Sequence, residues 1–235
     1  KLVVKVADSS DKSFQPRGKQ VLSPKGIWYT PVSGIWQSVW LETVPETRFL
    51  SYEAVADIDT KSLTVKTLTK GTAEGDIILA EVLEGGVGYS PEKPAEKVIA
   101  SAKAAEGKAV TVTLPEVKTW SPDSPYLYGL RLSVIRGDKV LDRVEGYAAM
   151  REISVVTDSH NYKRMALNGK TLFQFGPLDQ GWWPDGLYTA PTDEALRYDI
   201  VKTKELGFNM IRKHIKIEPA RWYFHCDQLG MMVWQ

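Results

Sequence analysis

The last third of the chain changes its hydrophobic period, and this change constrains the fold most. Strand-like and helix-like segments alternate there, with strands expected at residues 172–175, 208–212 and 231–235. Parallel strands need a crossover connection, so three strands joined by two helices predict the beginning of a larger α/β sheet or barrel. In such barrels the active site lies at the C-terminal ends of the strands, and several strands contribute to it. We therefore look for functional residues at those ends.

Two helices are predicted between these strands by their start and stop signals. Thr192 can accept hydrogen bonds from the free amides of the first helix, and Leu196 and Ile200 would form its buried face. Pro219 suits the first turn of the second helix, and Gly230 suits its end. These signals are local, so we expect both helices whatever surrounds them.

The rest of the chain alternates with period two and predicts a mainly β, multidomain protein. Residues 1–44 show alternation at 4–6 and 35–41, on either side of a loop rich in Pro and Gly. Residues 45–153 contain several short alternating strands, which predict a β-sandwich of about 100 residues. Residues 154–235 begin with a hairpin signal at Asn168-Gly169 and continue into the α/β segment.

One segment of the middle region is ambiguous. Residues 95–108 are rich in Ala, Glu and Lys, a composition that is also compatible with a helix. We interpret most of this segment as a polar loop and the edge of a strand.

Composition excludes several classes of partner. Lys and Arg total 30, Asp and Glu total 29, and the net charge is +1. Such a balance gives no electrostatic reason to expect nucleic acid or an anionic membrane as partner. No apolar run approaches the ~20 residues that span a bilayer. The single Cys226 excludes an internal disulfide framework but does not define the compartment.

The connection at residues 177–190 is the first candidate binding segment. Long loops in compact domains are usually functional or disordered, and this one follows a predicted strand. It contains Asp179, Gln180, Trp182 and Trp183. Flat apolar rings beside acids and amides suit sugar recognition, because the rings stack on the sugar while the polar groups bind its hydroxyls. The alternative is a lid whose aromatic rings pack against a neighbouring domain.

The second candidate segment is the end of the following strand. Arg212 and His214 share one side of that strand, whereas Ile211 and Lys213 share the other. If Ile211 faces the helices, Arg212 faces the barrel interior and needs a carboxylate partner there. The alternative is an arginine on the surface. His160, His214 and His225 have no metal-ligand spacing, so neither a metal nor a cofactor is predicted.

Three segments together resemble glycoside hydrolase family 2, the β-galactosidase, β-glucuronidase and β-mannosidase family. They are SGIWQSVWLE at 33–42, WSPDSPYLY at 120–128 and GFNMIR at 207–212. Their order and spacing are similar to three parts of that family. The resemblance implies that residues 1–44 end a jelly-roll sugar-binding domain and that 45–153 form an immunoglobulin-like sandwich. It also implies that 154–235 begin a (β/α)8 TIM barrel.

The resemblance implies a retaining exo-β-glycosidase that acts on a carbohydrate with two glutamates, their carboxyls about 5–5.5 Å apart. The family's acid/base follows an Asn, but Asn161, Asn168 and Asn209 precede Tyr, Gly and Met, so no residue present takes a catalytic role. Arg212 matches the arginine on the second barrel strand of that family, which helps to hold the nucleophile side of the active site. His214 follows that arginine by two residues instead of the three of familiar β-galactosidases, which puts galactose in doubt.

The resemblance leaves one alternative class and one question of location. The alternative is a non-catalytic carbohydrate-binding or scaffold module, which would have no use for an unfinished barrel. Polysaccharide-degrading members of the family are often exported, which implies a periplasmic or secreted protein. The substrate-binding candidates are Asp179, Gln180, Trp182, Trp183, Arg212 and His214.

Overall fold

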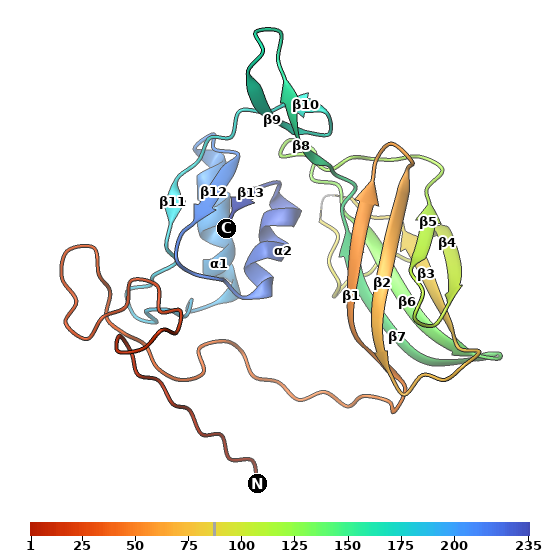
Figure 1. Ribbon diagram of the computed structural model, residues 1–235, viewed down its shortest axis with the longest axis horizontal. Helices are drawn as coiled ribbons and strands as arrows, with labels where there is room; N and C mark the ends of the chain where they lie inside the picture. Colours follow the sequence, from red (N-terminus) through yellow and green to blue (C-terminus); the bar gives the residue numbers. More distant parts are fainter. Residues whose placement is uncertain (87) are drawn as a thin grey trace. The chain divides into compact units, whose positions relative to one another are not determined.

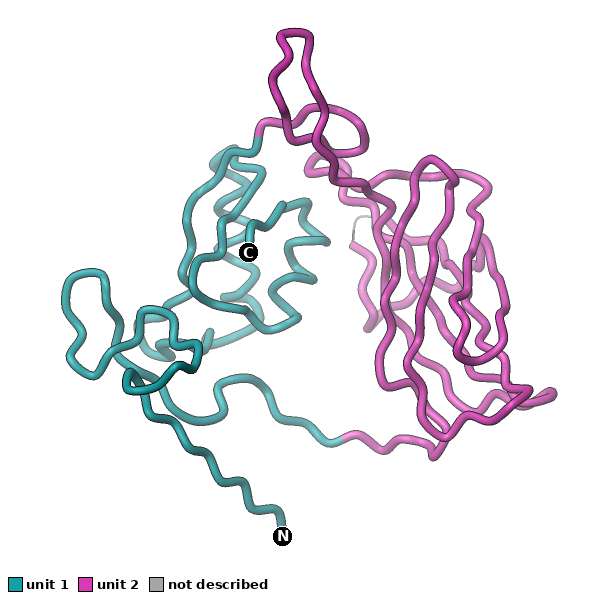
Figure 2. The backbone as a smooth tube through the Cα atoms, viewed as in Figure 1, with its two compact units in different colours: residues 1–41, 174–235 teal, residues 42–173 magenta. Residues whose placement is uncertain are grey.

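The computed structural model describes residues 1–86 and 88–235, which divide into two compact units (Figure 2). Unit 1 comprises residues 1–41 and 174–235, and unit 2 comprises residues 42–173. The described part of the chain is mainly β, and its helices α1 and α2 both belong to unit 1 (Figure 1).

Two antiparallel sheets with a shared core dominate unit 2. One has the order β1-β2-β5 and the other β4-β3-β6-β7. Their strands are β1 Arg48–Asp57, β2 Ser62–Lys70, β3 Ile77–Leu83, β4 Val98–Ala105, β5 Val110–Thr113, β6 Tyr128–Arg136 and β7 Lys139–Ala148. Alternate side chains such as Leu63, Ile78, Val112 and Leu130 are almost fully buried in one cluster. The ambiguous segment at 95–108 is a strand over Val98–Ala105 and not a helix.

A small antiparallel sheet of order β10-β9-β8 completes unit 2. It contains β8 Ile153–Thr157, β9 Lys163–Leu167 and β10 Lys170–Thr171. Asn168 and Gly169 connect β9 to β10 with φ of 52° and 73°. Two successive positive φ angles are what a two-residue hairpin turn requires, so this predicted hairpin is confirmed.

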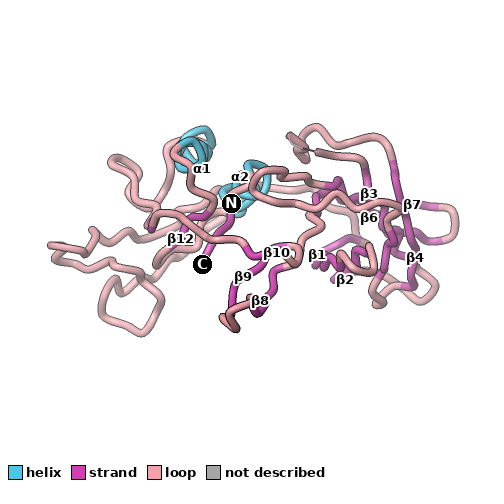
Figure 3. The backbone as a smooth tube through the Cα atoms, turned by 90° about the horizontal axis from the view of Figure 1, so that it is seen from above, coloured by secondary structure: helices cyan, strands magenta, loops and turns pink. Residues whose placement is uncertain are grey.

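The α/β part of unit 1 is a parallel sheet of order β11-β12-β13. Its elements are β11 Leu178–Asp179, α1 Asp193–Glu205, β12 Met210–Lys213, α2 Ala220–Leu229 and β13 Met232–Trp234. Both helices lie on the same side of the strands (Figure 3), where Ile211 packs with helix residues Leu196, Ile200 and Trp222.

The first strand was predicted too early, at residues 172–175. Leu172 still belongs to the preceding hairpin, because its amide donates to the carbonyl of Met165. Pairing with the next strand begins only at Phe175, whose carbonyl accepts from the amide of Asn209. The strand itself is Leu178–Asp179, so it ends where the long connection begins.

The predicted start of α1 and the predicted end of α2 are confirmed, whereas Pro219 directly precedes α2 and does not lie in its first turn. The Thr192 hydroxyl accepts from the amide of Ala195 at 3.1 Å, as the cap of α1. Leu196 and Ile200 are buried, as expected. Gly230 follows α2 with φ of 74°, a left-handed conformation that glycine adopts without steric cost.

The predicted strands in residues 4–6 and 35–41 are wrong. In residues 1–41, all of which are described, Gln20 and Tyr29 form an isolated bridge and no strand forms. Ile35, Val39 and Leu41 are 60%, 72% and 98% exposed. A strand exists only where a neighbour supplies its hydrogen bonds, and the described residues supply none along these segments.

Candidate functional site

Four charged side chains meet at the C-terminal ends of β11 and β12, within unit 1. We call Asp179, Lys213, Lys216 and Glu218 the charge cluster. Lys213 Nζ donates to Asp179 Oδ2 at 2.5 Å and to Glu218 Oε1 at 2.9 Å. Lys213, Lys216 and Glu218 are 2%, 2% and 4% exposed. Buried charges persist only when they are paired, and two cations here balance two carboxylates.

Lys213 enters this cluster because of its place in β12. It lies on the same side of the strand as buried Ile211, towards the helices. Its ammonium lies 4.3 Å from the centroid of the Trp222 ring on α2. The ring face and the two carboxylates together replace the water that this cation loses.

Lys216 connects the cluster to the loop after β11. Its Nζ donates to the carbonyl oxygens of Gly181 and Tyr188, both at 2.7 Å, and lies 3.2 Å from Glu218 Oε2. Burial lowers the pKa of Lys216, whereas the charge and hydrogen bonding of Glu218 act in the opposite direction. Two donors of the ammonium thus point at loop carbonyls, and the same ammonium forms an ion pair with the Glu218 carboxylate.

The close approach of loop and cluster depends on Gly181. This residue has φ of 64°, and a Cβ there would lie 2.2 Å from Glu218 Oε1 and 3.0 Å from Lys216 Nζ. A larger residue would therefore meet both a strained backbone and the buried ion pair. The Gly181 amide donates to Asp179 Oδ1 at 2.7 Å, which closes the turn.

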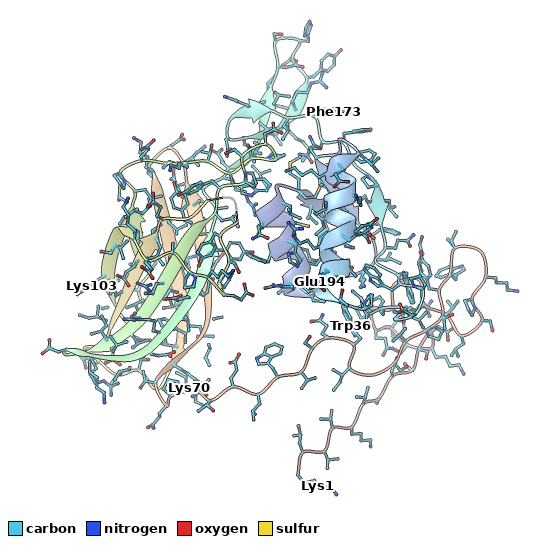
Figure 4. The ribbon with its side chains drawn as sticks, turned by 180° about the vertical axis from the view of Figure 1, so that it is seen from behind. Lys1, Trp36, Lys70, Lys103, Phe173 and Glu194 are labelled. Atoms are coloured by element: carbon cyan, nitrogen blue, oxygen red, sulfur yellow. The ribbon has the colours of Figure 1, made fainter. Side chains whose placement is uncertain are left out.

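Aromatic rings connect the same loop to the N-terminal segment. Trp182 stacks on Tyr29 with centroids 4.3 Å apart, and Trp36 meets Tyr188 edge-on at 4.5 Å. Thr189 Oγ1 donates to the carbonyl of Trp36 at 2.9 Å. Trp36 accordingly lies near the beginning of α1, where Figure 4 labels Glu194. Residues 1–41, which form no strand, are thus held against the loop after β11 by ring packing.

A groove of about 730 Å³ runs beside these rings, within unit 1. Its lining includes Asp8, Arg17, Trp36, Tyr188, Arg212 and His214. The Arg212 side chain is exposed, on the opposite side of β12 from buried Ile211. Desolvation lowers the pKa of His214, and the charges of Lys19 and Arg212 lower it further. The groove therefore offers charged, amide and aromatic groups to a polar ligand.

The structure does not bring the six predicted binding residues together in one place. Arg212 and His214 line the groove. Asp179 is bound within the charge cluster, while Trp182 stacks on Tyr29. Trp183 packs against the helix core, and its buried Nε1 has no hydrogen-bond partner among the described residues. Gln180 Oε1 is likewise buried without a partner in the described part of the chain.

The sequence reasoning missed Lys213, Lys216 and Glu218 as a group. One signal was present, because Lys213 shares the phase of buried Ile211 and must therefore point inward. A buried lysine requires an acid nearby, which makes Glu218 a candidate. Asp179 lies too far along the chain to be paired with Lys213 without the fold.

Within residues 1–86 and 88–235, His, Cys, Asp and Glu do not gather in groups of three that could hold a metal. Neither described helix is long and apolar enough to cross a membrane.

Comparison with known proteins shows which family this chain is similar to. Residues 46–151 match the family described as Glycosyl hydrolases family 2. The chain is 24% identical to a β-galactosidase of Thermoanaerobacter pseudethanolicus, over 100% of this chain and 30% of that protein. It is 28% identical to a putative β-glucuronidase of Formosa agariphila, over 90% of this chain and 20% of that protein.

A solved structure agrees with the sequence comparison. The crystal structure of a β-glycosidase from Bacteroides vulgatus superposes with a TM-score of 0.68 and 24% identity. The superposition covers 88% of this chain and 26% of that one. The match of residues 46–151 and the two similar sequences confirm the resemblance to glycoside hydrolase family 2, and the solved structure shows a shared fold. The chain spans less than a third of the length of these relatives.

Proposed function

We propose that this chain is part of a family 2 retaining exo-β-glycosidase, which hydrolyses terminal β-linked sugars. Residues 1–44 would end a jelly-roll sugar-binding domain, and residues 45–153 would form an immunoglobulin-like sandwich. Residues 154–235 would begin a (β/α)8 barrel. The observation that supports this most is the parallel β11-β12-β13 sheet with α1 and α2 as its crossover helices, in a chain whose residues 46–151 match the family.

The reaction would need two glutamates, one to attack the anomeric carbon and one to protonate the leaving oxygen. We propose that neither is among residues 1–235. Glu218 lies at the end of a barrel-like strand, but its carboxylate is 4% exposed and is bound by Lys213 and Lys216. A carboxylate held between two ammonium groups is a poor nucleophile and cannot approach a sugar.

The residues present would bind and orient the substrate. Arg212 is exposed beside the groove, where it can hold the carboxylate nucleophile supplied by another part of the barrel. His214 lies in the same groove and can donate to or accept from a sugar hydroxyl. The loop at 179–190 would supply further contacts through Asp179, Gln180, Trp182 and Trp183.

The test compares the complete protein with residues 1–235. Nitrophenyl β-galactoside, β-glucuronide, β-mannoside and β-glucoside serve as substrates, and at least one should be cleaved by the complete protein. Residues 1–235 should cleave none. NMR of the first product should show the β-anomer, because two displacements retain configuration. An α-anomer, or turnover by residues 1–235 that Glu218→Gln abolishes, would contradict the proposal.

A further inference from the structure

The Lys216 ammonium is an unusual group to find at this position. Its side chain is 1% exposed, and an apolar side chain would avoid the cost of removing a charge from water. Its two hydrogen bonds to main chain nevertheless reach the first and last residues of one loop segment, Gly181 and Tyr188. A single cation thus closes an eight-residue segment at both ends.

That segment carries one wall of the groove. Tyr188 lines the groove together with Trp36, and the two rings are in edge contact. The Lys216 ammonium lies 4.6 Å from the Tyr188 ring centroid and 5.3 Å from that of Trp36. The same charge therefore contacts the backbone of the segment and both aromatic faces, which lie beside Arg212 and His214.

We infer that Lys216 is a positioning residue, which holds the 181–188 segment and the Tyr188–Trp36 pair as a wall of the sugar subsite. The inference rests on the proposed glycosidase function for its substrate. Binding groups must be held within a fraction of an ångström to contribute fully, so release of this wall should weaken substrate binding more than it slows the chemical step.

Lys213 provides a matched control, because it belongs to the same cluster and is equally buried. Its ammonium bonds to Asp179 and Glu218 but to neither of the loop carbonyls that Lys216 holds. Lys213→Met and Lys216→Met therefore remove the same charge from the same buried network. Only Lys216→Met also removes the hydrogen bonds to the carbonyl oxygens of Gly181 and Tyr188.

The experiment uses the complete protein and the β-glycoside that it cleaves best. Lys216→Met should raise KM by about 10-fold or more while kcat changes by less than about 3-fold. Lys213→Met should lower stability by a similar amount but raise KM less than Lys216→Met does, because the loop carbonyls keep their bonds to Lys216. Gly181→Ala tests the same wall without removing a charge, because its Cβ would displace Glu218 and Lys216, and it should raise KM as well.

Chymotrypsin supplies a readout that does not depend on activity, because the bonds after Trp182 and Tyr188 are cleavage sites for it, whereas Pro184 protects the bond after Trp183. Cleavage there should be faster in Lys216→Met than in Lys213→Met, under conditions where both variants remain folded. Equal KM values and equal cleavage in the two variants would overturn the inference. If the wild-type protein cleaves no β-glycoside, the proposed function fails, and the cleavage rates alone decide whether Lys216 holds the loop.

Discussion

Replacing Lys213 by Met should destabilise unit 1 strongly, although the two side chains have similar volumes. The Lys213 side chain is 1% exposed, and its ammonium binds two carboxylates and lies 4.3 Å from the centroid of the Trp222 ring. Methionine would keep the apolar packing and remove the charge. The cluster would change from two cations and two anions to one cation and two anions.

The magnitude follows from how much solvent each carboxylate can regain. Removal of one partner from a buried ion pair usually costs about 3–5 kcal/mol. The side chain of Asp179 is 25% exposed, so water can partly replace Lys213 there. Glu218 is 2% exposed at its side chain but keeps Lys216 at 3.2 Å. These two compensations and the packing of Met place the expected loss near the lower limit, at about 3 kcal/mol.

Tryptophan fluorescence during urea unfolding measures the loss of stability of unit 1. Seven of the eight tryptophans lie in unit 1, because Trp120 alone falls within residues 42–173. With an m-value of about 2 kcal/mol/M, the midpoint should fall by about 1.5 M. The double variant Lys213→Met/Glu218→Gln restores a balance of one cation and one anion, so it should recover about 1–2 kcal/mol relative to the additive expectation.

Lys202→Met is the control for the loss of a lysine as such. Lys202 pairs with Glu205 on the surface of α1, with side-chain exposures of 48% and 55%. Exposed pairs contribute little, so its midpoint should stay close to that of the wild type. The reasoning about burial is refuted if Lys213→Met shifts the midpoint no more than Lys202→Met, or if the double variant loses as much stability as the two single variants added together.

Three further predictions concern single interactions. Leu130→Ala in β6 removes a core side chain that is 1% exposed, so unfolding of unit 2 should lose about 2–5 kcal/mol in a urea titration followed by circular dichroism. Hydrogen bonds from Arg136 and from the Ala73 amide lower the pKa of Asp76 to about 2, below its unfolded value. This contribution to stability is present above about pH 4 and is lost as the pH falls towards 2, so Asp76→Asn should lower the midpoint at neutral pH and flatten its dependence between those limits. Thr192→Ala removes the cap of α1 and should cost about 1 kcal/mol, whereas Thr192→Ser should cost less.

Elements with local signals were predicted well from the sequence. The cap at Thr192, the stop at Gly230 and the Asn168-Gly169 turn each involve residues only a few positions apart. Their energies arise within one turn of chain, so distant residues hardly change them. The faces of β12 were also predictable, because Ile211 lies towards the helices and Arg212 lies opposite, as strand alternation requires.

Elements that need a distant partner were predicted poorly. Alternation at 35–41 indicates a strand only if another segment supplies its hydrogen bonds, and the described structure supplies none. Ring packing holds this part of the chain instead, through Trp36 on Tyr188 and through Tyr29 on Trp182. Tryptophan and tyrosine can make such contacts from an irregular backbone, so their partners cannot be predicted from spacing.

The charge cluster lies between these two extremes, and Gly181 shows why. In the sequence this glycine is only a loop residue before two tryptophans, with no visible reason to be small. In the fold its missing Cβ leaves the space that Glu218 Oε1 and Lys216 Nζ occupy. Lys216 can then bond the loop carbonyls, and Glu218 can neutralise both lysines. The loop is thus ordered by the buried charges of Lys216 and Glu218, which fit there only because Gly181 has no side chain. Gly181 is therefore as necessary to the candidate site as the charges themselves.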